Sequence, residues 1–234
     1  HGDAIDLADQ VFLFKRTVRE TAIAHEMHAT FLARPMSEEA GSALHIHQSV
    51  VDADGKNVFS TDDGEPSELF MSYIGGLQKY MPQALLLFAP YPNSYRRFLS
   101  HWASPVNLGW AMDNRTVGLR VPDSVPEARR VENRLAGSDV NPYLALAGTL
   151  ACGYLGMIEG AKPDDPVEGS AYDLPFSLHR VLYESIDAFE GSQLLRRTLG
   201  DKFVDIYSEI KKHECREFQE IVTPWEREVL MFNV

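Results

Sequence analysis

The chain has little cysteine, a shortage of positive charge and no long uninterrupted apolar run. Its two cysteines, Cys152 and Cys215, are too few for a disulfide framework, which favours a reducing compartment, and we expect a cytoplasmic protein. The 22 basic residues against 34 acidic ones give a formal charge of −12. This balance argues against a chain-wide nucleic-acid or anionic-membrane surface, so neither partner is expected. The longest apolar stretch, about 15 residues from Leu144 to Ile158, is short for a membrane span and predicts a buried helix.

Several common catalytic motifs are also absent. The sequence has no G-x-S-x-G, no P-loop and no C-x-x-C. Lysine is missing from residues 96–134, although seven arginines lie there: Arg96, Arg97, Arg115, Arg120, Arg129, Arg130 and Arg134. Arginine presents a planar fork that binds carboxylates and phosphates in fixed geometry, so this composition favours anion recognition. Surface charge on helices and strands is the alternative explanation.

The apolar spacing predicts one domain over residues 1–234. Helices are expected at 4–27, 67–89 with a break near Pro82, 94–99 and 141–159, and over 177–220 with breaks at Gly191 and Gly200; a short helix follows from Pro224. Strands are expected at 44–51, 106–112, 115–121 and 129–135, with a turn at 52–55 and a hairpin partner at 57–60. Because helices dominate the C-terminal part, the pattern predicts the α+β class.

Polar side chains alternate along the first expected strand. Alternate residues of a strand share a face, so His45, His47 and Ser49 face one side, opposite the side of Ile46 and Gln48. Two imidazoles and a hydroxyl on one face suit a metal ion or a phosphate. The alternative is the exposed polar face of a half-buried strand.

A second polar stripe lies on the strand expected at 129–135. Arg130, Glu132 and Arg134 share one face there. Two cations beside one carboxylate suit a metal ion together with the oxygens of an anionic substrate. A solvated ladder of surface charges is the alternative.

In this order and spacing, these stripes resemble the catalytic domain of the glutamine synthetase family. Six segments carry the resemblance: 41–49, 93–97, 105–107, 113–115, 129–134 and 141–144. The family implies a largely antiparallel curved sheet flanked by helices, with a helical C-terminal part. It also implies an ATP-dependent ligase that joins glutamate to ammonia or an amine through γ-glutamyl phosphate. Such chemistry requires Mg²⁺ or Mn²⁺ and arginines at the transferring phosphoryl group.

The resemblance also implies roles for particular residues. His45 and Glu132 would bind a metal ion. The ATP side of the site would be formed by His47, Ser49, Arg115, Arg120 and Arg130. Glutamate would be bound by Gly41, Arg97 and Arg134. Arg115 and Arg134 would be the catalytic pair, at the phosphates and at the reacting carboxyl group. Because Arg115 and Arg120 are five residues apart, a regular strand would place them on opposite faces, so Arg115 must act from the turn.

Two departures from the family pattern concern the substrates. Ammonia-using members carry Glu at the position of Ala103, where the acid helps to hold ammonium. Ala103 removes that charge and opens space, which favours the subgroup that uses an alkylamine or polyamine, such as γ-glutamylputrescine synthetases. We expect the carbon tail of the amine to fill this space, near Trp102 or Trp110. Ala40 stands where many members carry Asn in a loop that holds glutamate.

The resemblance implies that the chain corresponds to about half of a subunit. Family members have a small N-terminal β domain and further metal-binding glutamates before the point where this chain begins, and they assemble as stacked hexameric rings. We therefore expect the 234 residues alone to be inactive. Two alternatives remain: an ammonia-using glutamine synthetase, which Ala103 disfavours, and a non-catalytic structural relative, which the retained His45 and Glu132 disfavour.

Overall fold

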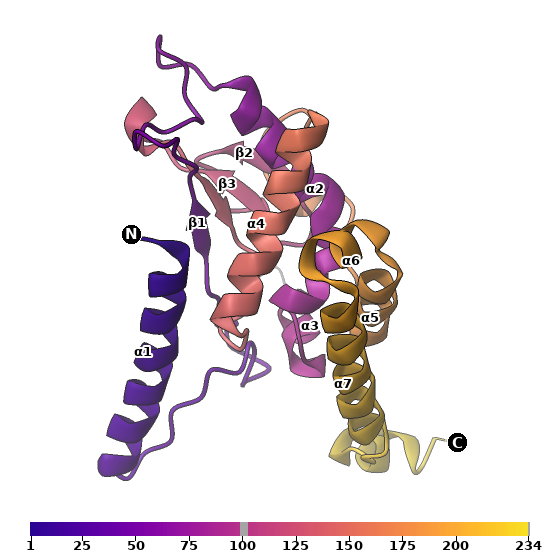
Figure 1. Cartoon of the computed structure of the whole chain (residues 1–234). Helices are drawn as coiled ribbons and strands as arrows, with labels where there is room; N and C mark the ends of the chain where they lie inside the picture. The colour runs from indigo at the N-terminus through magenta and orange to yellow at the C-terminus, as the bar shows by residue number, and fades with distance from the viewer. Residues whose placement is uncertain (99–102, 234) are drawn as a thin grey trace.

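The computed structural model describes residues 1–98 and 103–233, and its centre is a small mixed sheet (Figure 1). The strands β1 (Ile46–Gln48), β2 (Trp110–Met112), β3 (Leu119–Val121) and β4 (Val131–Asn133) lie in the order β1-β4-β3-β2. β4 pairs antiparallel with β1 and β3, whereas β2 pairs parallel with β3. The sheet is therefore largely antiparallel, as expected, with one parallel edge.

Two long helices pack together beside the sheet. α2 (Glu68–Phe88) begins at Ser67, whose hydroxyl accepts a hydrogen bond from the Phe70 amide. α4 (Pro142–Glu159) begins at Asn141, whose side chain accepts from two amides of the first turn. Side chains of this kind satisfy the amides that a helix start leaves unpaired, and proline at the first helical position costs no hydrogen bond.

A buried polar network joins the inner face of the sheet to both helices. The Tyr73 hydroxyl of α2 donates to Gln48 Oε1 over 2.7 Å, and the Thr149 hydroxyl of α4 donates to the same oxygen over 2.9 Å. Asn133 of β4 donates to Thr149 over 3.2 Å. Because Gln48 and Asn133 are fixed on this inner face, their neighbours His47 and Glu132 are turned toward the opposite face.

Helix α1 (Ala4–Ala24) lies on one side of the molecule and helices α5 (Leu182–Gly191), α6 (Gln193–Leu199) and α7 (Asp201–Gln219) lie on the other (Figure 1). α1 packs against α4, whereas α5, α6 and α7 pack on one another and on α2 and α4. The remaining helical segments are short: α3 (Pro92–Phe98), η1 (Pro126–Ala128), η2 (Ala171–Asp173) and η3 (Glu226–Leu230). No helix among the described residues is long and apolar enough to cross a lipid bilayer.

The α+β class is confirmed, and the helix ends at Gly191 and before Gly200 agree with the predicted breaks. The break near Pro82 is wrong, because α2 runs unbroken through this residue. The helix expected from residue 177 begins only at Leu182. The strands are also shorter than predicted, and the pair around the turn at 113–118 is parallel. Alternation of side chains is the same for either strand direction, so the sequence pattern carried no information on this point.

Glycines allow α2 and α4 to approach backbone to backbone. A Cβ atom added at Gly76 would lie 2.5 Å from the Gly156 Cα atom and 2.5 Å from the Cys152 carbonyl oxygen. At Gly153 it would lie 2.1 Å from the Tyr73 ring. These distances are too short for a Cβ atom, and a helix backbone cannot yield as a flexible side chain can. The helices must therefore separate if either glycine gains a side chain.

We expect Gly76→Ala to lower the free energy of unfolding by about 2 kcal/mol, within the usual range for overpacking a close contact. Gly191→Ala is the matched control, since no atom lies within 4 Å of a Cβ at this position. It should leave stability unchanged or slightly raised, because alanine is favoured over glycine in helices. Urea unfolding followed by circular dichroism measures both variants; equal midpoints would contradict the close packing.

Candidate active site

The centre of the candidate site is Glu132, whose side chain is only 2% exposed. Strand register brings its neighbours into place, because His47 of β1 and Arg120 of β3 lie directly opposite Glu132. Arg134 follows two residues later on the same face of the chain. The site is therefore built from three adjacent strands, and the pairing of the strands alone sets which side chains meet.

Both carboxylate oxygens of Glu132 are bound by cationic or imidazole groups. Oε1 accepts from Arg134 Nη1 over 2.8 Å and lies 2.9 Å from His45 Nδ1. Oε2 accepts from Arg120 Nη1 over 2.7 Å and lies 4.0 Å from His47 Nε2. Of the two cations expected beside this carboxylate, Arg134 binds it, whereas the second is Arg120 of β3 and not Arg130. Because Glu132 is buried, a solvated ladder of surface charges does not describe the cluster.

These neighbours decide the ionisation of Glu132. Burial by itself would raise the pKa of the carboxyl group, because a charge is costly away from water. Hydrogen bonds from His45 and Arg120, together with the charge of Arg134, outweigh burial and hold the pKa of Glu132 well below its usual range. The group is therefore a carboxylate at every physiological pH and can act as a ligand or an acceptor.

His47 and Arg130 extend the cluster toward solvent. Arg130 Nε donates to His47 Nδ1 over 3.3 Å. Burial lowers the pKa of His47, and the nearby Arg130 adds to this effect although Glu132 opposes it. A neutral ring that accepts at Nδ1 carries its proton on Nε2, the nitrogen nearer Glu132.

The turn between β2 and β3 places Arg115 apart from Arg120. Arg115 is exposed and lies in the turn outside β3, as its predicted role requires, and that role stays a prediction. The Asn114 side chain holds this turn by accepting from the Thr116 amide over 2.9 Å. Asp113, to which sequence reasoning assigned no role, binds the second arm of Arg120.

Arg97 and Gly41 lie in contact with each other beside the segment that follows β4. The Arg97 guanidinium is buried and donates to the backbone carbonyls of Leu135 over 2.6 Å and Arg134 over 2.7 Å. A Cβ atom at Gly41 would lie 2.8 Å from Arg97 Cγ, which explains the glycine. Arg97 therefore supports the segment after β4, a role that the sequence did not reveal. Its predicted contact with glutamate stays a prediction.

The remaining predicted residues lie nearer the surface. Ser49 is exposed one residue after β1. Ala103 is exposed and has a left-handed backbone, with φ of 58°. Trp102 lies outside the described residues. Trp110 is buried on β2, where its indole N–H donates to the Asp164 carbonyl over 2.7 Å, so its ring offers little surface to an amine.

His45 and Glu132 fit a divalent cation as two neighbouring ligands. Their facing atoms are 2.9 Å apart. The same two atoms share a hydrogen bond, so a cation would bind both only in place of the proton on His45 Nδ1. Within residues 1–98 and 103–233, no group of three or more His, Cys, Asp or Glu side chains is arranged to hold a metal ion. A cation held by His45 and Glu132 would therefore need further ligands from substrate oxygens or other groups.

Comparisons with known proteins show the family of the chain. Residues 1–230 match the family model described as glutamine synthetase, catalytic domain. The chain is 38% identical over 238 aligned positions to a γ-glutamylputrescine synthetase of Escherichia coli, covering 100% of this chain and 50% of the relative. It is 35% identical to a glutamate–isopropylamine ligase of a Pseudomonas species, covering 97% and 50%.

A glutamine synthetase of Halobacterium salinarum is 33% identical, with 97% of this chain and 52% of that protein covered. The solved structure described as "Apo GmaS without ligand" superposes with a TM-score of 0.88 at 30% identity, covering 99% of this chain and 54% of that one. The chain therefore belongs to the glutamine synthetase family, as the motifs predicted. It spans about half the length of the curated relatives it matches.

Replacing Glu132 tests whether the cluster depends on its carboxylate. We expect Glu132→Gln to lower the free energy of unfolding by about 3 kcal/mol, because Arg120 and Arg134 would keep their charges without the buried partner. The control is Asp113→Asn, which removes the exposed acceptor of Arg120 and should cost less than about 1 kcal/mol. Denaturant unfolding of both variants measures the difference, and equal losses would show that the buried carboxylate is not the organising group.

Proposed function

We propose that the protein containing this chain is an ATP-dependent ligase that joins the γ-carboxyl group of glutamate to an amine. One observation carries the proposal: the buried Glu132 carboxylate surrounded by Arg120, Arg134 and His45. The glutamate–amine ligases among the relatives support the same conclusion.

The reaction proposed has two steps. A carboxyl oxygen of glutamate attacks the γ-phosphorus of ATP, and the bond to the β-phosphate oxygen breaks to give γ-glutamyl phosphate and ADP. The amine nitrogen then attacks the acyl carbon, phosphate leaves, and the nitrogen loses a proton to water or to a base. Phosphoryl transfer of this kind depends mainly on positioning and on neutralising charge.

The described residues would contribute these effects directly. Mg²⁺ or Mn²⁺, bound by His45 and Glu132, would neutralise phosphate charge. Arg120 and Arg130 would bind phosphate oxygens beside the cluster, and Arg134 would hold the reacting carboxyl group. Arg115, on its exposed turn, would reach the phosphoryl group as it transfers. Arginine suits each of these roles because its fork binds two oxygens in one plane.

The amine is favoured over ammonia by Ala103. The exposed alanine carries no charge to hold ammonium and leaves room for a carbon chain. The relatives that act on putrescine and isopropylamine support this preference, whereas the glutamine synthetases among the relatives keep ammonia as the second candidate donor. We also propose that residues 1–234 alone are inactive, because no group of three or more His, Cys, Asp or Glu side chains among the described residues is arranged to hold a metal ion.

Glutamate-dependent ADP release tests the proposal. The natural full-length polypeptide is assayed with ATP, Mg²⁺ and glutamate, using putrescine, isopropylamine and ammonium in parallel, beside the isolated 234-residue chain. We expect release with an amine, much less with ammonium, and none from the isolated chain. Absence of release with every donor would contradict the ligase, and turnover by the isolated chain would refute its inactivity.

Two variants separate the charge at position 103 from its volume. Ala103→Glu restores the acid and should shift the preference toward ammonium, whereas Ala103→Gln fills the same space without a charge and should only weaken use of the amine. Both side chains meet the same left-handed backbone, so strain is matched between them. An unchanged donor preference in Ala103→Glu would show that this position does not select the amine.

A further inference from the structure

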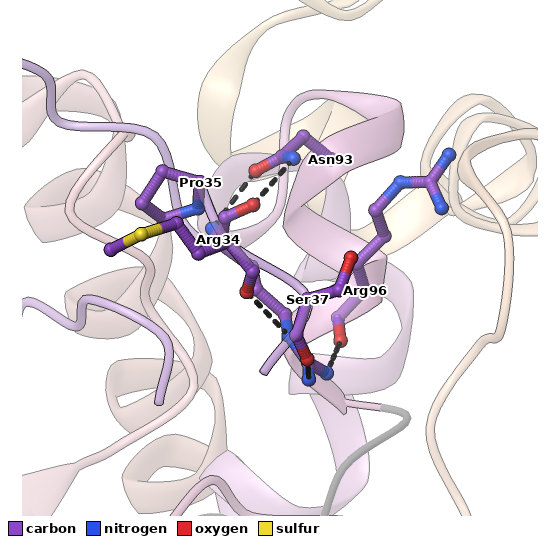
Figure 2. Close-up of a pocket in the computed structure, with 6 residues that line it drawn as sticks. Arg34, Pro35, Ser37, Asn93 and Arg96 are labelled. Atoms are coloured by element: carbon purple, nitrogen blue, oxygen red, sulfur yellow. Dashed lines mark hydrogen bonds between the residues drawn. The ribbon is translucent and has the colours of Figure 1, made fainter. Parts of the chain in front are cut away.

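The side chain of Arg34 binds three backbone carbonyl groups at once (Figure 2). Its Nη1 donates to the Arg96 carbonyl of α3 over 3.0 Å, while Nη2 donates to the Ser37 carbonyl and Nε to the Met36 carbonyl over 3.4 Å. One guanidinium therefore ties the segment that follows it to the last turn of α3. Three carbonyls converging on one fork match its fixed geometry, which a lysine ammonium does not provide.

Asn93 holds the backbone of the same residue. Its Oδ1 accepts from the Arg34 amide over 2.9 Å, and its Nδ2 donates to the Arg34 carbonyl over 2.9 Å. The amide side chain thus pairs with the chain as a neighbouring strand would. Arg34 is consequently fixed to α3 through both its backbone and its side chain, and we name this set of contacts the Arg34–Asn93 clamp.

The clamp is the main attachment of residues 35–40, all of which are exposed. A cavity of about 390 Å³ lies beside them, lined by Arg34, Pro35, Met36, Ser37, Asn93 and Arg96. The far end of the segment returns to its start, because the Ser42 amide donates to the Ala33 carbonyl over 2.7 Å. Little apolar packing supports this loop, so its conformation depends on these hydrogen bonds.

The same helix connects the loop with Glu132. Gly41 lies against the Arg97 stem, and the Arg97 guanidinium donates to the carbonyls of Arg134 and Leu135 directly after β4. α3 is anchored further by the Ser94 hydroxyl, which donates to Asp139 over 2.6 Å. The loop and the carboxylate cluster are therefore attached to consecutive residues of one short helix.

We infer that Arg34 and Asn93 are positioning residues, which set the Gly41 loop in register with the Glu132 cluster and so determine how tightly glutamate binds. The inference deepens the proposed function and rests on it for its substrate. Arg34 and Asn93 touch neither glutamate nor ATP in this account; they act through the backbone of residues 34–41.

The test compares Arg34→Met with Arg96→Met. Both changes replace one arginine beside the same cavity, but the Arg96 guanidinium points away from the clamp (Figure 2), and its contribution is a backbone carbonyl that the variant retains. Arg34→Lys keeps the charge without the fork, and Asn93→Ala removes the other half of the clamp. Hydrogen exchange of peptides covering residues 33–44 is measured in the natural polypeptide, together with KM for glutamate, KM for ATP and kcat.

We expect Arg34→Met and Asn93→Ala to speed exchange in these peptides and to raise KM for glutamate about tenfold, with KM for ATP and kcat nearly unchanged. Arg34→Lys should resemble Arg34→Met, while Arg96→Met should resemble the unmodified protein. Unchanged exchange would overturn the clamp, and faster exchange with an unchanged KM for glutamate would overturn the positioning role. Equal losses for both substrates, or equal effects from Arg96→Met, would likewise overturn it.

The two proposals fail in different ways. Absence of ligase activity in the unmodified protein would refute the proposed function, and the exchange measurement would still decide whether the clamp holds the loop. Ligase activity in the unmodified protein, with the same KM for glutamate in Arg34→Met and Asn93→Ala, would refute only the inference.

Discussion

The buried carboxylate of Glu132 is the interaction on which the site depends. A lone charge at this depth would be strongly unfavourable, so its burial is possible only because Arg120, Arg134 and His45 surround it. Those partners lie on different strands, and their meeting requires the β1-β4-β3 register. The pairing of three strands thus stabilises the charge of one side chain, and the contacts of that side chain stabilise the pairing in return.

Hydrogen bonds on the inner face of the sheet hold the strands in this register. Gln48 and Asn133 are bound to Tyr73 and Thr149 there, so the strands carrying His47 and Glu132 cannot rotate. The approach of α2 and α4 at their glycines fixes the two helices that present these partners. Arg97 then attaches the chain after β4 to α3, which also carries the clamp on the Gly41 loop. The side chains proposed to bind the metal ion, phosphate and glutamate are therefore all held by the sheet and the helices packed on it.

The sequence was most informative where the alternation of a strand coincides with side chains that bind metal ions or anions. Alternation alone placed His45 and His47 opposite Ile46 and Gln48, and it placed Arg130, Glu132 and Arg134 on one face. It could not give the direction of β2 and β3, because alternation does not depend on direction. The burial of Arg97 was also hidden, since arginine is usually exposed and its carbonyl partners have no sequence signature. The Arg34–Asn93 clamp is hidden for the same reason: the Arg34 side chain donates to a backbone carbonyl 62 residues away, and the Asn93 side chain donates to one 59 residues away.

The central claim is that the Glu132 carboxylate, already ionised and oriented by its arginines, is a ligand for the cation of the proposed reaction. Mn²⁺ binding measured by electron paramagnetic resonance tests it directly in the natural polypeptide with ATP present. We expect Glu132→Gln to weaken Mn²⁺ binding by about 10- to 100-fold and Asp113→Asn to leave it nearly unchanged. Equal Mn²⁺ affinity in Glu132→Gln and the unmodified protein would contradict the account.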